Sequence, residues 1–443
     1  MTADLAVVGA GPAGLAAAGT AAALGLSVTL LDAGERVGGQ IHRHPAHGTV
    51  PRAARDLVRR LGGVRHLPGH HVWTVVRDAD GWLLHAVVGA DETPATVRAR
   101  NVLLATGAHE RQLPFPGWTL PGVVGAGGAQ AMLKSGGVLP GRRVVVAGSG
   151  PLLLAVARTL AAAGARVPAL VEAADPTAYA RHLPALARNP GKLTEGAGHG
   201  AALLRRTTRL LTRHAVTAAH GTTRLEAVTV TRLDRAWRPV PGTGRRIPCD
   251  ALAVGHGLVP QLELATGLGC ATRRTPDSTP ALHVDTEQRT SVPGVWAAGE
   301  TCGVGGADLA RTEGEIAALS LAGGDPRRAA VLVRRRARLR AFADAMAAVH
   351  RPGPGWTDWL DGATEVCRCE EVTAGRIREA VTELGARDAR TVKLLTRAGM
   401  GWCQGRVCGQ AVARLAGEDP APDRRPLSCP VPLSHLAQPP GAA

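Results

Sequence analysis

The chain has 443 residues, of which 45% are hydrophobic and 20% charged, and its formal net charge is +16. This length predicts several folded units, and no apolar run approaches the roughly 20 residues of a membrane-spanning helix, so we expect a globular protein without a membrane span. The positive charge comes almost entirely from arginine, because lysine occurs only at positions 134, 192 and 393. No aromatic binding platform accompanies the charge, and the composition therefore argues against nucleic-acid binding.

The N-terminal stretch is typical of a βαβ unit. An apolar strand over residues 5–8 leads into Gly9-Ala-Gly11-Pro12-Ala-Gly14, an alanine-rich helix follows to about Leu24, and a second strand ends at Asp32. In this context the pattern G-x-G-x-x-G predicts a dinucleotide-binding loop. The first strand begins too early for a secretory signal to precede it, so we expect a cytoplasmic protein.

Each glycine of this loop has a physical task. Gly9 permits the tight turn, Gly11 lets the backbone approach a pyrophosphate, and Gly14 lets the helix lie close to the strand. The helix N-terminus stabilises the phosphate charge. Asp32 is expected to accept hydrogen bonds from the adenosine ribose.

Three later segments favour FAD over NAD. Gly38-Gly39-Gln40 continues the first unit, and a strand from Asn101 ends in Ala105-Thr106-Gly107, after two β-like runs over 72–76 and 83–88. The run from Thr290 to Gly299-Glu300 resembles the sequence that supports the flavin ribityl chain in two-dinucleotide flavoproteins. Glu300 stands where Asp is commoner; its carboxylate can accept a ribityl hydroxyl, and the alternative is a helix-capping or surface acid.

A second βαβ unit begins at Val144, and it departs from the pattern. Gly148-Ser-Gly150 is followed by Leu153 where the third glycine would stand, and Pro168 interrupts the strand that leads to Glu172. Both features argue against NAD(P) binding. The alternatives that stay open are a working NAD(P)H site, a structural domain, and a site for another adenine nucleotide.

The rest of the chain predicts a return to the first domain and then a separate module. Strands near 225–231 and 251–255, the segment 294–299 and a helix over 307–321 are expected of an FAD domain split by the second unit. An arginine-rich helix follows over 325–346, and we interpret its densest part, Arg334 to Arg340, as a solvated face. Turn residues at 351–355 predict a linker, residues 361–416 an α-rich module, and the proline-rich tail from 417 an extended or poorly ordered segment.

Four of the eight cysteines form two close pairs, Cys367-Arg-Cys369 and Cys403-Gln-Gly-Arg-Val-Cys408. Four thiolates suit an iron–sulfur cluster or zinc, and spacers of one and four residues are unusual for zinc. Flanking glycines allow backbone N–H groups to approach the sulfur atoms. The remaining alternative is four ordinary buried thiols. The flavoprotein region has no CxxC or CxxxxC motif, which excludes a dithiol relay of the thioredoxin reductase type.

Longer segments carry a resemblance to a known family. They are Gly38 to Arg43, Ala105 to Trp118, Leu120 to Val124, Gly148 to Leu154, and the paired cysteines. The chain resembles the FAD/NAD-fold subunit of opine oxidases, hydrogen cyanide synthase and hydroxyproline dehydrogenases. Its last segment resembles the bacterioferritin-associated-ferredoxin-like [2Fe-2S] domain. His42 stands where the family would have Tyr, so we assign that side chain no role.

The resemblance implies an α/β fold with two Rossmann-like domains and a small α-rich C-terminal [2Fe-2S] domain. The expected divisions are 1–120 and 256–325 for the FAD domain, 121–255 for the NAD(P)-like domain, 326–360 for a helical linker, 361–416 for the [2Fe-2S] domain and 417–443 for the tail. The cluster ligands would be the four paired cysteines. The expected FAD contacts are Gly9, Gly11, Pro12, Gly14, Asp32, Gly39, Gln40, Val72, Ala105, Thr106, Gly107, Gly299 and Glu300.

The function that this resemblance implies is electron relay within a heteromeric amino- or imino-acid dehydrogenase. A partner subunit of the D-amino-acid-oxidase type would oxidise the substrate, and a quinone or another carrier would accept the electrons. The main alternative is a stand-alone NAD(P)H-dependent reductase that donates to a protein, and a third is a redox-inert scaffold. No residue is identified as a catalytic base, because a structural role is the commoner outcome for His109 and His256.

Overall fold

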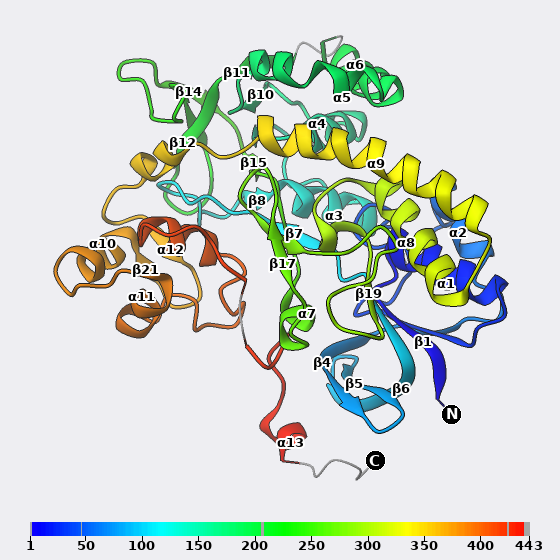
Figure 1. Ribbon diagram of the computed structural model, residues 1–443. Coiled ribbons are helices and arrows are strands. Elements are labelled where there is room, and N and C mark those ends of the chain that lie inside the picture. Colours follow the sequence, from blue (N-terminus) through cyan, green and yellow to red (C-terminus); the bar gives the residue numbers. More distant parts are fainter. Residues whose placement is uncertain (1, 46, 205–207, 423–424, 438–443) are drawn as a thin grey trace.

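The computed structural model describes residues 2–45, 47–204, 208–422 and 425–437. Figure 1 shows the first domain at one end of the molecule, the second domain at the other, and the C-terminal module beside them. No helix in the described ranges is long and apolar enough to cross a membrane.

The first domain is built on one mixed sheet. Its parallel part has the order β3-β2-β1-β6-β19, and the long strand β6 also pairs antiparallel with β5, which pairs with β4. Strands β1 and β2 and the end of β6 are apolar and almost entirely buried, as expected for the centre of a sheet that is covered on both faces. Their bounds are β1 (Ala3–Val8), β2 (Val28–Leu31), β3 (Arg65–Leu67), β4 (His70–Asp78), β5 (Gly81–Val88), β6 (Thr93–Leu104) and β19 (Val295–Ala297).

Helices of the first domain come from distant parts of the sequence. Helix α1 (Pro12–Ala23) packs along α8 (Ala307–Ala322), while α2 (Arg52–Arg59) lies beside α1. The close approach of α1 and α8 requires glycine, because a Cβ on Gly314 would lie 2.1 Å from the carbonyl oxygen of Ala13. The return of the chain to the first domain thus completes the layer that covers its sheet.

The second domain has a parallel sheet of order β11-β10-β9-β15-β8 and a three-stranded antiparallel sheet β12-β13-β14. Strands β9 and β15 are fully buried, and helices cover the parallel sheet. The strands are β8 (Val123–Gly125), β9 (Val144–Gly148), β10 (Ala169–Glu172), β11 (Arg209–Thr212), β12 (His214–His220), β13 (Ala227–Arg232), β14 (Arg245–Pro248) and β15 (Ala251–Gly255). The helices are α3 (Ala126–Gly136), α4 (Leu152–Ala162), α5 (Leu183–Ala187), α6 (Pro190–Leu204) and the 3-10 helix η1 (Pro176–His182).

Two small ribbons and two short helices join the domains. Strand β7 (Ala108–Glu110) pairs antiparallel with β16 (Leu258–Pro260), and β17 (Thr272–Arg274) pairs with β18 (Pro280–Leu282). The short helix α7 follows β16, and the 3-10 helix η2 follows β19; their bounds are Glu263–Gly267 and Gly299–Cys302.

Helix α9 (Pro326–Val349) crosses the molecule from α8 to the second domain, as Figure 1 shows in yellow. The helix lies where we expected a helical linker, but it is packed against α8, α5 and η1 rather than exposed. The expectation of a solvated arginine face is wrong for two of its residues. Arg336 and Arg340 bind the fully buried Glu313 of α8, because that carboxylate needs charged partners.

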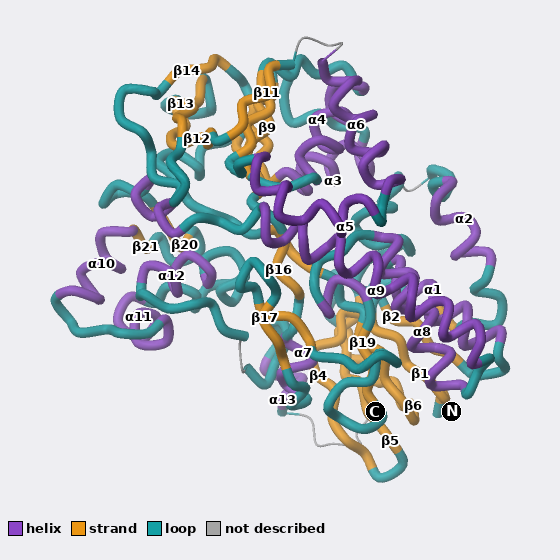
Figure 2. Tube along the Cα trace, turned by 45° about the horizontal axis from the view of Figure 1, so that its top comes forward, coloured by secondary structure: helices purple, strands orange, loops and turns teal. Residues whose placement is uncertain are grey.

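The C-terminal module shares a hydrophobic core with the second domain. The module has three helices and a two-stranded ribbon, and its core continues through Trp356 and Trp359 to Trp237. Figure 2 shows α10, α11 and α12 together beside the ribbon. The elements are η3 (Pro354–Trp359), β20 (Glu365–Cys367), β21 (Val372–Thr373), α10 (Ala374–Thr382), α11 (Ala389–Thr396), α12 (Gly409–Leu415) and, in the tail, α13 (Leu433–Leu436).

Candidate functional site

The first glycine loop has the close contacts that its spacing predicts. Gly9 has φ +108°, and a Cβ there would lie 2.3 Å from the carbonyl oxygen of Ala105. A Cβ on Gly14 would lie 1.8 Å from the carbonyl oxygen of Gly9, so α1 approaches β1 as closely as backbone permits. Pro12 is the first residue of α1. The N-terminus of this helix therefore opens beside the ends of β1 and β6.

A second glycine segment closes over the first. Gly39 has φ +57°, and a Cβ there would lie 2.9 Å from the Cα of Gly11. Two glycine segments without side chains thus lie against each other at the start of α1. Backbone exposed in this way can approach a pyrophosphate closely, and this place is called the cradle below. Gln40 is exposed, and its side-chain oxygen accepts a hydrogen bond from Arg43 at 2.8 Å.

Asp32 lies at the end of β2, beside this cradle. Its two carboxylate oxygens accept hydrogen bonds from the backbone N–H groups of Ala10, at 2.5 Å, and Gly34, at 2.6 Å. A carboxylate oxygen has two lone pairs, so each can accept a further hydroxyl. Val72 lies on β4, whose first residue, His70, donates its N–H to the Asp32 carbonyl oxygen at 2.8 Å; the Val72 side chain is in the hydrophobic core, and its carbonyl oxygen accepts a hydrogen bond from Ser428.

The segment after β6 meets the segment after β19. The Thr106 hydroxyl donates to the carbonyl oxygen of Gln261 at 2.8 Å, and the Gly107 N–H donates to the Thr301 hydroxyl at 3.2 Å. Thr301 is fully buried and follows Glu300 directly. Sequence reasoning missed Thr301, although its place next to the ribityl-type segment was a usable signal.

Glu300 is half-buried, and its two carboxylate oxygens differ in their hydrogen bonds. Its Oε1 accepts from the backbone N–H groups of Gly305, at 3.4 Å, and Gly306, at 2.8 Å. Within the described ranges its buried Oε2 has no hydrogen-bond partner, and burial raises the pKa of this carboxyl group. An orphaned buried acceptor at this position fits a ligand hydroxyl. The neighbouring Gly299 is held by Glu313, whose Oε2 accepts from the Gly299 N–H at 3.0 Å.

The second glycine loop is tied to the chain's own side chains. Glu172 accepts hydrogen bonds from the N–H groups of Gly150 and Ala174, and its Oε1 lies 3.4 Å from His350 Nδ1. Burial by itself raises the pKa of Glu172, but the hydrogen bond and charge of His350 outweigh it and hold the pKa below its usual value. His350 also lies 3.1 Å from the Ser149 hydroxyl. The end of α9 therefore meets the carboxylate where a nucleotide ribose would bind.

The four paired cysteines differ in exposure, and each sequence pair contributes one buried and one more exposed thiol. Cys367 and Cys408 are each 1% exposed, whereas Cys369 is exposed and Cys403 is half-buried. A hydrogen bond from the Cys408 thiol lowers the pKa of Cys367 to about 5 although burial opposes it, and the same bond raises the pKa of Cys408. The backbone N–H of Gly399 points at the Cys367 sulfur at 3.4 Å. Cys367 and Cys408 thus form an inner pair joined by a hydrogen bond, and Cys369 and Cys403 form an outer pair.

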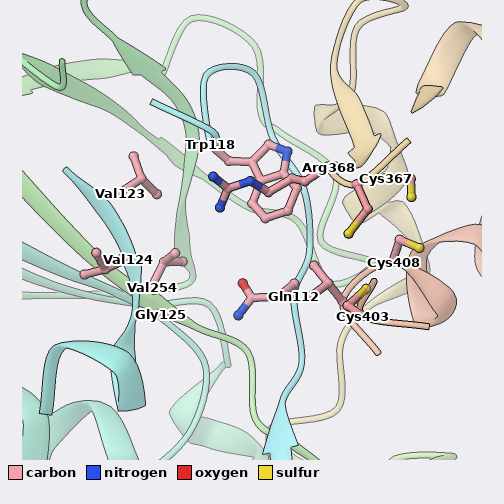
Figure 3. A pocket seen from close by; sticks show the side chains of 12 residues that line it. Gln112, Trp118, Val123, Val124, Gly125, Val254, Cys367, Arg368, Cys403 and Cys408 are labelled. Carbon is pink, nitrogen blue, oxygen red and sulfur yellow. The ribbon is translucent and has the colours of Figure 1, made fainter. Parts of the chain in front are cut away.

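These cysteines line one cavity of about 440 Å³ together with the edge of the second domain. In Figure 3, Cys367, Cys403 and Cys408 lie along one wall, while Trp118 stacks with Arg368 above and Val124 and Val254 lie opposite. Two pairs around a shared space suit a two-iron cluster, in which each iron takes two thiolates. Among the described residues, no three His, Cys, Asp or Glu side chains converge for a single metal ion.

The segment after Gly107 connects the two domains. Glu110 accepts from the N–H groups of Gly127, at 2.7 Å, and Gly128, at 3.2 Å, at the start of α3. Arg111 is buried and binds Asp277 at 2.6 Å. His109 and His256, to which no catalytic role was assigned from the sequence, differ in exposure, since His256 is buried and His109 half-buried. Burial lowers the pKa of His109 and, with Arg111, lowers that of His256 to about 4. His256 lies against the rings of two tryptophans rather than in an open site.

The family model for pyridine nucleotide-disulphide oxidoreductases matches residues 3–314. The chain belongs to this family. A BFD-like [2Fe-2S] binding domain matches residues 365–418. These matches confirm the expected fold and imply both expected cofactors, FAD and a [2Fe-2S] cluster; they favour the cluster over zinc and over ordinary thiols.

Relatives and a solved structure extend the match to nearly the whole chain. The HcnB subunit of hydrogen cyanide synthase from Pseudomonas protegens is 35% identical over 91% of this chain and 89% of its own length. An opine oxidase subunit from Agrobacterium tumefaciens is 33% identical over 93% and 85%. The structure of L-proline dehydrogenase from P. horikoshii aligns with a TM-score of 0.69 at 19% identity, covering 99% of this chain and 80% of that one. The first two confirm the expected family; the last shows a common fold.

Proposed function

We propose that this oxidoreductase is the electron-relaying subunit of a heteromeric dehydrogenase for small amino or imino acids, of the opine, hydroxyproline or glycine class. One observation carries the proposal: a single chain joins an FAD fold to a cluster module whose inner cysteine pair is buried and whose outer pair reaches the surface. The exposed outer pair leaves the module accessible to an external carrier such as a quinone.

The residues present fit both cofactors. FAD bound here would accept two electrons from a substrate, and a [2Fe-2S] cluster would pass them on singly. We assign the pyrophosphate to the cradle of Gly9, Gly11 and Gly39 at the start of α1, and the ribose to Asp32. The free oxygen of Glu300 would accept a ribityl hydroxyl. The full proposed contact set is Gly9, Gly11, Pro12, Gly14, Asp32, Gly39, Gln40, Val72, Ala105, Thr106, Gly107, Gly299 and Glu300, with Cys367, Cys369, Cys403 and Cys408 as cluster ligands.

The proposed partner is a flavoprotein subunit of the D-amino-acid-oxidase type that holds the substrate. Support comes from the names of the relatives, which are subunits of hydrogen cyanide synthase and opine oxidase. We also propose a cytoplasmic location, since all eight cysteines are free of disulfides, as a reducing compartment would keep them. The domain divisions expected from the sequence are proposals as well.

The test is a cofactor and turnover measurement on the purified complex. We expect about one FAD and two irons per chain, and bleaching of the flavin by an opine, a proline derivative or glycine only when the partner is present. Cys408→Ser should lose iron and keep FAD, whereas Cys249→Ser, a buried cysteine of the second domain, should keep both. A chain without iron, or a complex that no such substrate bleaches, would contradict the proposal.

A second candidate is an NAD(P)H-dependent reductase that donates electrons to a protein. The complete five-stranded sheet of the second domain and the carboxylate of Glu172 favour it. Against it stand Leu153, which is buried against the sheet, and His350, which binds that carboxylate. Anaerobic mixing with NADH or NADPH decides the matter: we expect the flavin to stay oxidised, and prompt reduction would favour this candidate.

A further inference from the structure

Arg406 lies between Cys403 and Cys408, yet its side chain leaves the cluster module. Its Nε lies 2.8 Å from Glu263 Oε1, at the start of α7 in the first domain. Its Nη2 donates to the carbonyl oxygen of Ser428 in the tail. The backbone carbonyl of Arg406 accepts a hydrogen bond from His109 of β7. One residue of the cluster loop thus contacts three separate segments outside the module.

Two of these contacts lead directly to the proposed flavin site. The Gln261 N–H donates to the carbonyl oxygen of Gly107 at 2.9 Å, and the Gln261 carbonyl accepts from Thr106. His109 follows Gly107 by two residues, and Glu263 follows Gln261 by two. Arg406 in turn precedes the ligand Cys408 by two residues. The contacts of Arg406 with Glu263 and His109, called the junction below, therefore lie within two residues of a proposed flavin contact or its hydrogen-bond partner on one side, and two residues from a cluster ligand on the other.

The tail supports the same loop from its other side. Ser428 donates from its N–H to the Trp73 carbonyl at 2.9 Å and from its hydroxyl to the Val72 carbonyl at 3.0 Å, both on β4. Arg425 donates to the side chain of Gln404, within the cluster loop, at 2.6 Å. The loop that carries two cluster ligands is thus held against the first domain by contacts that the module itself does not supply.

The ion pair at the junction is shielded from water. The Arg406 side chain is 23% exposed and that of Glu263 16%, and Glu263 Oε2 is buried without a partner among the described residues. Such a pair holds a more definite geometry than a fully exposed pair does, because water reaches only a small part of either group. Arginine suits the task, since its planar fork directs Nε to Glu263 and Nη2 to Ser428 in fixed directions, whereas an ammonium group is a compact charge on a flexible stem.

We propose that Arg406 is a positioning residue that sets the placement of the cluster loop against the flavin site, and thereby the rate at which electrons cross between the two cofactors. The inference rests on the proposed function. Oxidation of one substrate molecule would release two electrons, and a [2Fe-2S] cluster held by the four cysteines would accept them one at a time, so the crossing would occur twice per turnover. Transfer of this kind weakens steeply with separation, which makes the placement of the loop decisive.

The experiment compares Arg406→Gln, Arg406→Lys and Glu263→Gln with the control Arg397→Gln, which removes an exposed ion pair to Glu370 within the same module. The flavin of the holoprotein is photoreduced with a laser flash, and the relaxation between flavin and cluster absorbance gives the internal transfer rate. Hydrogen exchange over 399–408 reports the placement of the loop independently of any activity.

We expect Arg406→Gln and Glu263→Gln to keep FAD and iron, to exchange faster over 399–408, and to slow internal transfer by about tenfold, because displacements near 1 Å between reacting groups are already costly. Arg406→Lys should lie between, and Arg397→Gln should match the parent chain. Faster exchange with an unchanged transfer rate would overturn the inference. Loss of iron from both variants would overturn it too, since the junction would then retain the cluster rather than place it. Absence of either cofactor, or of any transfer, in the parent chain would instead refute the proposed function.

Discussion

Gly14 lies where α1 leaves β1, and its missing side chain is what lets the two elements meet. We expect Gly14→Ala to lose most of its bound FAD and about 2 kcal/mol of stability, because the added Cβ would collide with the Gly9 carbonyl and force the helix away from the strand. FAD content after gel filtration and urea unfolding measure the two effects. Gly198→Ala is the matched control, since that helical position of α6 has open space around it and should gain roughly 0.5 kcal/mol. Full FAD retention in Gly14→Ala would contradict the assignment of this loop.

His256 is buried between the domains, against Trp237 and Trp359. Burial, with Arg111 nearby, lowers its pKa to about 4, so the folded chain keeps it neutral where an unfolded chain would protonate it. The unfolded state then binds more protons between about pH 6.5 and pH 4. Stability should therefore fall as pH falls through that window, by about 3 kcal/mol from this residue, and change no further below it.

Urea unfolding at pH 7 and pH 4.5 tests this pH dependence. His256→Gln should show a shallower loss of stability than the parent chain, while half-buried histidines whose pKa burial also lowers, such as His71 and His109, maintain part of it. His47→Gln, at an exposed position, serves as the control and should leave the slope unchanged. Equal slopes for all three chains would show that His256 is not the group responsible.

Helix α9 acts as a brace for the segment that carries Gly299 and Glu300. Its Arg340 donates to Glu313 at 2.7 Å and to the Gly303 carbonyl at 2.7 Å, and Glu313 binds the Gly299 N–H. The brace connects a helix outside the first domain to the residues proposed to hold the ribityl chain. An arginine-rich helix that looks like a surface element thus becomes part of the flavin site's support.

Breaking this brace should be costly, because it leaves a buried carboxylate short of a partner. We expect Arg340→Met to lose about 3 kcal/mol of stability and to release FAD more readily. Arg334→Met, at an exposed position of the same helix, should change stability by less than about 0.5 kcal/mol. The double variant Glu313→Gln/Arg340→Met should cost less than the sum of its parts. Strict additivity in urea unfolding would contradict a direct pair.

At the scale of the whole molecule, the cluster module is not an independent appendage. Its core runs through Trp356 and Trp359 into the second domain, and the Trp359 indole donates to the Trp237 carbonyl at 2.9 Å. Trp118, just before the second domain, donates to the Glu365 carbonyl at 2.7 Å, two residues before a cluster ligand. We therefore expect the module and the second domain to unfold together.

Thermal unfolding of the holoprotein tests this coupling. Cluster bleaching and tryptophan fluorescence should show the same midpoint, and Trp359→Ala should lower both midpoints together through a loss of about 3 kcal/mol. Trp402→Ala, whose side chain is 75% exposed beside Cys403, should leave both nearly unchanged. Bleaching of the Trp359→Ala cluster at a temperature where the fluorescence does not change would show that the module unfolds alone.

The sequence by itself determined the two nucleotide-type units, the split first domain and the cysteine module. Gly9, Gly11 and Gly14 are required by the local geometry of the backbone, and the two cysteine pairs are required by the chemistry of a metal cluster. A short window of residues is therefore enough to identify each motif. Leu153, which stands in place of the third glycine of the second loop, can also be identified from a short window of residues. Fold class, family and cofactor types could therefore be predicted from the order of the residues alone.

Only the tertiary structure decided which distant side chains support these sites. Glu313, His350 and Arg406 contact Gly299, Glu172 and Glu263, which lie 14, 178 and 143 residues away in the chain, and no periodicity or spacing connects them to these partners. Arginine and glutamate are also the residue types that usually lie in water, so their sequence context suggested a solvated surface. Burial against a distant element changed that role, and burial is a property of the folded chain rather than of any one of its segments.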